Sequence, residues 1–63
     1  MNISKEKVNI LLARNNLNTK ILAEKCNMSR TRISTILNSR NLKPQTVGKI
    51  AEALGVDVTE IIE

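Results

Sequence analysis

The feature that most constrains the fold is a short interruption of a helical pattern, in the stretch AEKCNMSRTRIST from residue 23 to residue 35. Apolar residues recur at helical spacing before the interruption and again directly after it. Only Asn27, Met28 and Ser29 separate the two predicted helices. A connection of this length is too short for a relaxed antiparallel hairpin and favours a sharp bend. We therefore expect two short helices that cross closely.

The residues around the interruption have the properties that such a bend requires. Ala23 is small, where the second helix has to cross the first one closely. Asn27 follows four residues later and tolerates the left-handed backbone conformation that commonly ends a helix. Asn18 is a favourable N-cap for the first helix of the pair, and Ser29 is one for the helix that follows. The residues expected to form the shared core of the crossed pair are Leu22, Cys26, Met28, Ile33 and Ile36.

The remaining sequence predicts three further short helices and no strand. A first helix is expected from about Ser4 to Asn15, with Ser4 as its N-cap. A fourth has Pro44 in its first turn and ends at Gly55, and Asp57 caps a short fifth helix. Gly48 in the middle of the fourth helix costs about 1 kcal/mol relative to Ala, and we expect it to permit close packing against a neighbouring helix. The predicted fold is all-α, with five short helices around one core, in a single domain that covers residues 1–63.

The charge of the chain is distributed very unevenly. Residues 1–49 contain all ten Lys and Arg residues, opposed only by Glu6 and Glu24, which gives +8. Residues 50–63 contain four acidic residues and no basic one, which gives −4. This pattern indicates one surface that faces a polyanion and a second surface turned away from it. An ordinary solvated, Lys-rich surface is the alternative explanation.

The composition also argues against several classes of function. The chain contains no aromatic residue and no His, and Cys26 is its only cysteine. Stacking on single-stranded nucleic acid, a metal site and a nucleophile–base pair are therefore disfavoured, and we expect neither an enzyme nor a cofactor. Cys26 is expected to be a buried, reduced thiol. No apolar run is long enough to span a membrane and no signal peptide is visible, so we expect a cytoplasmic protein that makes no membrane contact.

Two motifs carry a resemblance to a known family. The stretches LNTKILAEKCNMSRTRISTILN and KPQTVGKIAEALGVDVTEII are similar to the DNA-binding domain of phage repressor and Cro proteins, the XRE-type helix-turn-helix family. The resemblance runs from Leu17 to Glu63, and the predicted first helix extends it over nearly the whole chain. Two positions depart from the family, which usually has Gly at Asn27 and often has Gly at Ser39.

The resemblance implies that the helix after Ser29 lies in the major groove of double-stranded DNA and acts as the recognition helix. Its implied base-reading residues are Ser29, Arg30, Thr31, Ser34 and Thr35. Arg30 can form a bidentate contact with guanine, and a threonine offers a hydroxyl or a methyl group. The implied phosphate contacts are Asn18, Thr19, Lys20, Arg32, Asn38, Arg40, Lys43 and Gln45. For each of these residues the alternative is an ordinary solvated position.

The resulting hypothesis is a transcriptional regulator, in particular a repressor that binds a palindromic operator as a homodimer. The dimer surface is expected at the acidic end, through Val56, Val58, Ile61 and Ile62. Of the last two residues, Ile62 is expected to lie further inward, and the alternative is that all four complete the monomer core. No small-molecule ligand is expected, because the chain leaves no room for a sensor domain. The competing function is an antitoxin or a small protein-interaction adaptor that uses the same fold.

Overall fold

The computed structural model describes all residues, 1–63, and contains four α-helices followed by one short 3-10 turn. The elements are α1 (Lys5–Arg14), α2 (Thr19–Cys26), α3 (Arg30–Asn38), α4 (Pro44–Leu54) and η1 (Val58–Glu60). The predicted all-α class is confirmed, and the predicted short fifth helix, capped by Asp57, is present as a 3-10 turn rather than as an α-helix. It is limited to a 3-10 turn because the residues that follow it pair with the N-terminal segment of the chain.

The predicted helix starts are confirmed by side-chain caps. The Oγ of Ser4 accepts a hydrogen bond from the Lys7 amide at 3.2 Å, and Asn18 Oδ1 accepts one from the Ile21 amide at 2.9 Å. Ser29 Oγ accepts a hydrogen bond from the Arg32 amide at 3.0 Å and so fixes the start of α3. Each cap satisfies an amide that has no partner within its helix.

The bend between α2 and α3 depends on a left-handed residue at the predicted position. Asn27 has φ of 57° and ψ of 43°, and its amide donates to the carbonyls of Ala23 and Glu24. The Met28 amide also donates to the Ala23 carbonyl, at 2.9 Å. The amide side chain allows Asn to adopt this conformation more readily than other L-residues, which explains why Asn can replace the usual glycine here.

The second departure from the family, Ser39, does not adopt a left-handed conformation. Ser39 has an extended backbone, with φ of −88° and ψ of 153°, so no glycine is required at that position. The left-handed residue of this connector is Asn41, with φ of 58°. The Ser39 hydroxyl donates to the Thr35 carbonyl, which extends the hydrogen bonding of α3 by one side chain.

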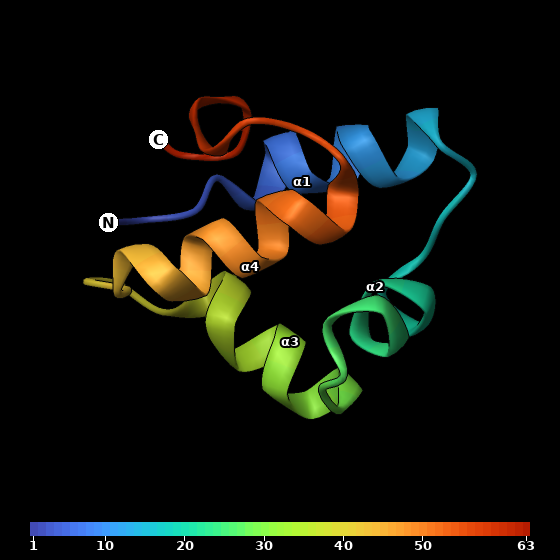
Figure 1. The fold of residues 1–63 in the computed structure, drawn as a ribbon, viewed down its shortest axis with the longest axis horizontal. Coiled ribbons are helices and arrows are strands. Elements are labelled where there is room, and N and C mark those ends of the chain that lie inside the picture. Colours follow the sequence, from blue (N-terminus) through green and yellow to red (C-terminus); the bar gives the residue numbers. More distant parts are fainter.

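One apolar core joins all the elements. Its 15 buried residues come from the four helices and from the two terminal segments, and none of them is polar. Ala23 is 2% exposed where α2 meets its neighbours, and α2 packs against both α3 and α4. Met28 is only half-buried, at the edge of this core. In Figure 1, α2 and α3 lie along the lower edge, whereas η1 and both termini lie on the opposite side of α4.

The two ends of the chain pair with each other, a feature that the sequence did not predict. Ile3 and Ile62 form an antiparallel bridge, the Ser4 amide donates to the Ile61 carbonyl at 2.7 Å, and the Glu63 amide donates to the Asn2 carbonyl at 3.1 Å. The same N-terminal segment also holds the connector between α3 and α4. The Leu42 amide donates to the Met1 carbonyl at 2.7 Å, and the Asn41 amide donates to Asn2 Oδ1 at 3.0 Å.

This pairing corrects the expectation for the two C-terminal isoleucines. Ile61 is completely buried, whereas Ile62 is half-buried, which is the reverse of the predicted order. The chain turns at Ile61, with φ of −122° and ψ of −6°, directly before Ile62 pairs with Ile3, so the two side chains face different surroundings. Ile61 is therefore a core residue and does not offer its side chain to a dimer surface.

The expected role of Gly48 is also wrong. No heavy atom of a neighbouring element lies within 4 Å of the position that a Cβ atom would occupy on Gly48. Close packing within the monomer therefore does not require glycine at this place in α4.

We predict that Gly48→Ala stabilises the protein by about 1 kcal/mol, because alanine has the higher helix propensity and the added methyl group meets open space. Urea denaturation of the two proteins measures the difference. A lower free energy of unfolding in the variant would contradict the description of this site as unobstructed.

At the bend, Asn27→Ala is predicted to destabilise the protein by up to about 1–2 kcal/mol, whereas Asn27→Gly keeps or raises its stability. The reason is that alanine, unlike glycine, is strained in the left-handed conformation. The same denaturation experiment distinguishes the two variants, and equal stability of both would show that the left-handed turn is not limiting.

Candidate nucleic-acid interface

The exposed side of α3 is entirely polar. Ile33, Ile36 and Leu37 are buried and anchor the helix in the core. The remaining residues are all exposed and all capable of hydrogen bonding: Arg30, Thr31, Arg32, Ser34, Thr35 and Asn38. Two of them are positively charged, and the chain contains no acidic residue between Glu24 and Glu52. This side of α3 therefore presents a positive surface rich in donors, and we call it the α3 face.

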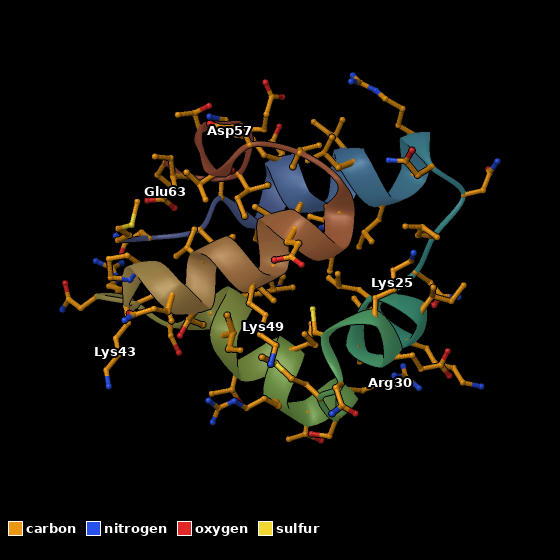
Figure 2. All side chains as sticks on the ribbon, in the orientation of Figure 1. Lys25, Arg30, Lys43, Lys49, Asp57 and Glu63 are labelled. Atoms are coloured by element: carbon orange, nitrogen blue, oxygen red, sulfur yellow. The ribbon has the colours of Figure 1, made fainter.

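The charged residues separate in space much as they do in the sequence. In Figure 2, Arg30 lies at the lower right of the molecule, and Asp57 and Glu63 lie at the upper left. Several basic residues depart from this division. Lys7 Nζ donates to the Ile62 carbonyl at 3.0 Å, Arg14 lines a groove with Glu60, and Arg40 lines a cleft with Glu63. The α3 face itself contains no acidic residue, and its end at Asn38 adjoins a cleft that also holds Lys5 and Glu63.

Two open grooves flank the α3 face. The α1–α3 groove, of about 560 Å³, is lined by Lys5, Asn9, Thr19, Arg30, Thr31, Ser34, Leu37 and Asn38. The α3–α4 groove, of about 340 Å³, is lined by Arg32, Thr35, Ile36, Ser39, Asn41, Leu42, Lys43 and Thr46. Four of the five predicted base-reading residues line one groove or the other, and Ser29 lies at the start of the helix between them.

The hydrogen bonds within α3 define what its side chains can still offer. Thr35 Oγ1 donates to the Thr31 carbonyl at 3.0 Å, which leaves its oxygen as an acceptor and its methyl group free. Ser29 Oγ serves as the acceptor of the helix cap, so its hydroxyl proton remains available to a ligand. Acceptors and methyl groups on threonine, and donors on arginine and serine, are the groups that distinguish base edges in a major groove.

The start of α2 supplies donors beside the α1–α3 groove. Because Asn18 Oδ1 accepts from the Ile21 amide, the NH2 group of Asn18 is the part of the side chain left for a ligand. Thr19 lines the groove, and Lys20 is exposed one residue further on. The first amides of a helix have no intrahelical partner and favour an anion. The predicted phosphate role of this region is therefore geometrically reasonable.

The predicted phosphate residues do not all gather around α3. Arg32 and Lys43 line the α3–α4 groove, and Asn38 lines the α1–α3 groove. Arg40 lines an adjoining cleft of about 250 Å³, which shares Lys5 and Asn38 with the α1–α3 groove and also contains Glu63. Gln45 lines a surface between α2 and α4, together with Lys25 and Lys49.

Sequence reasoning missed Lys5 and Asn9, which line the α1–α3 groove from the side opposite α3. Their spacing of four residues places both on one side of a helix, and this signal is visible in the sequence. What the sequence does not contain is the orientation of α1 relative to α3, which is set by packing.

Cys26 has the structural role that was expected of it. It is 1% exposed, and burial raises the pKa of its thiol above the ordinary value, an effect that Lys49 partly opposes. A protonated thiol in the core is a poor nucleophile, so Cys26 does not contribute chemistry to the surface.

Comparison with known protein families agrees with this geometry. Residues 10–61 match the model of a helix-turn-helix family. The chain belongs to the XRE-type helix-turn-helix family, which includes Cro- and C1-like proteins. Membership in this family supports a function as a DNA-binding transcriptional regulator. A search of curated protein sequences found no match. None of the helices combines the length and the apolar character needed to cross a lipid bilayer.

Proposed function

We propose that the protein is a sequence-specific regulator that binds double-stranded DNA through the α3 face and represses transcription. The observation that carries this proposal is the composition of that face: six exposed hydrogen-bonding side chains, two of them arginines, on a helix whose other side is buried. A single α-helix fits the major groove, where each base pair presents a distinct pattern of donors and acceptors. In Figure 1, α3 lies at the lower edge of the fold, and its polar side chains are exposed there.

Within this proposal the side chains divide into two roles. Ser29, Arg30, Thr31, Ser34 and Thr35 read base edges, with Arg30 pairing with guanine O6 and N7. The start of α2, with Asn18, Thr19 and Lys20, contacts phosphates on one side of the helix. Arg32 and Lys43, in the α3–α4 groove, contact phosphates on the other side. Asn38 contacts a phosphate on the same side as the start of α2, and Arg40 lies beside it in the adjoining cleft, together with Glu63. Gln45 lies apart from these residues, on the surface between α2 and α4.

We further propose that two copies bind a palindromic operator. One recognition helix contacts only a few base pairs, and two related by a two-fold axis read half-sites about 10 bp apart. The dimer surface consists of the half-buried Val56, Val58 and Ile62 together with Ile10, which is 48% exposed. Ile10 lines the same surface groove as Thr59 and Glu60, so it adjoins η1. Such a small surface favours weak association that DNA strengthens.

The base-reading role of Arg30 is tested against the phosphate role of Lys43. We expect Arg30→Ala to weaken binding to a duplex selected from random DNA by about 1–3 kcal/mol and to relax the preference at one base pair of each half-site. Lys43→Ala should weaken selected and random duplexes by the same factor. Fluorescence anisotropy titrations measure both effects. If Arg30→Ala weakens both duplexes equally, Arg30 contacts phosphate and its assignment is wrong.

The dimer is tested by Ile10→Asp, which changes an exposed side chain and so leaves the core intact. A buried charge at an interface is costly, so we expect the variant to lose self-association and to bind the palindrome at least tenfold more weakly, with an unchanged circular dichroism spectrum. Gln45→Asp, on the surface between α2 and α4, is the matched control for sedimentation and should associate like the wild type. A wild-type protein that stays monomeric at millimolar concentration and binds one copy per palindrome would contradict the dimer.

A further inference from the structure

The wall of the α1–α3 groove that lies opposite α3 is formed by polar residues of α1. It is formed by Lys5 and Asn9, which are both exposed and lie one turn apart on α1. Neither residue belongs to the two helices of the bend or to the connector after them. They nevertheless face a groove whose other wall carries Arg30, Thr31 and Ser34.

The character of the groove restricts what it can hold. Seven of its eight lining residues are polar, and Leu37 is the single apolar one. Its two charged residues, Lys5 and Arg30, are both positive, and no acidic residue lines it. A groove of this composition offers little to an apolar ligand and favours an anion that accepts several hydrogen bonds.

The donors of the groove are already oriented. Lys5 Nζ donates to Asn38 Oδ1 at 3.4 Å, and Asn38 Nδ2 donates to the Ser34 carbonyl at 2.8 Å. With its oxygen occupied, the Asn38 amide retains one free N–H, and the Lys5 ammonium retains two. Thr19 adds its hydroxyl from the start of α2. Donors from three helices therefore surround one space.

We propose that Lys5 and Asn9 bind a backbone phosphate of the DNA strand that passes over the α1–α3 groove, so that α1 is a third helix of the DNA interface. The proposal rests on the proposed function, because it takes the α3 face as the reading surface. Arg30, Thr31 and Ser34 belong to that face and also line the groove. A strand whose bases meet these side chains therefore has its phosphates within reach of the opposite wall. This continuity identifies the anion as a phosphodiester of the bound duplex.

The experiment measures the affinity of four variants for a selected duplex and for a scrambled one, between 50 and 200 mM salt. Lys5→Ala is expected to weaken both duplexes on the order of tenfold per protomer at 100 mM salt, and to lower the slope of log K against log salt by about 0.9 per protomer. Lys5→Arg should retain the slope of the wild type. Lys49→Ala removes the same charge from the surface between α2 and α4, and it should leave the slope unchanged.

Asn9→Asp separates phosphate binding from the contact between Lys5 and Asn38. It removes no hydrogen bond of the folded chain and places a negative charge beside the expected phosphate, so it should weaken both duplexes by at least the same factor as Lys5→Ala. Circular dichroism melting of every variant verifies that these exposed substitutions leave the fold intact.

Each outcome decides the proposal. An unchanged salt slope in Lys5→Ala, with a wild type that binds the selected duplex tightly, overturns the role of α1 and leaves the proposed function standing. Loss of binding to the selected duplex alone would make Lys5 a base contact and would also overturn it. A wild type that binds neither duplex would end both proposals.

Discussion

The structure depends on one backbone constraint, the left-handed residue that ends α2 and lets α3 begin three residues later. With Asn27 at φ of 57°, the chain bends sharply within a single connection, and the Met28 amide donates back to the carbonyl of the small, buried Ala23. Leu22, Cys26 and Ile33 then form the joint core of the two helices. A longer connection would permit an antiparallel hairpin, in which more of α3 would be covered by its neighbour.

The polar face of α3 follows from this arrangement. Because the core takes only Ile33, Ile36 and Leu37 from the helix, every other position from residue 30 to residue 38 faces solvent. Only hydrogen-bonding residues occupy these positions, and four of the six acidic residues of the chain lie within residues 50–63. Ser29 belongs both to the fold and to the proposed reading surface. Its hydroxyl oxygen caps the start of α3, and its side chain lies at the beginning of the proposed reading surface.

Most of the fold could be predicted from the sequence because its signals are local. Ser4, Asn18 and Ser29 as caps, Asn27 and Gly55 as left-handed ends, and the apolar faces of the helices all depend on residues within one or two turns. The pairing of the two chain ends could not be predicted, because it joins residues about sixty positions apart. The C-terminal segment lacks the alternation of apolar and polar residues that indicates a strand. Ile61 and Ile62 were interchanged for that reason. Gly48 was misjudged because a glycine in a helix does not reveal which neighbour, if any, approaches it.

The candidate site was predictable only in part, because local signals are again readable from the sequence and long-range packing is not. The exposed positions of α3 follow from its periodicity, whereas the walls of the two grooves depend on how distant elements pack. Lys5 and Asn9 were missed, and Gln45 was grouped with connector residues although it lines the surface between α2 and α4. Arg40 does line a cleft together with Asn38. The family resemblance implies which helix reads the DNA but does not determine what surrounds that helix in this chain.

The most direct test of the central claim, that α3 reads base edges in the major groove, changes the DNA and leaves the protein intact. In a duplex selected from random sequences, 7-deazaguanine replaces one guanine at a time and removes only the N7 acceptor of the major groove. Inosine at the same positions removes only the amino group of the minor groove. We predict that 7-deazaguanine weakens binding by about 1–3 kcal/mol at one guanine of each half-site and that inosine has no effect there. Weakening by inosine, with full affinity for every 7-deazaguanine duplex, would contradict recognition through the major groove.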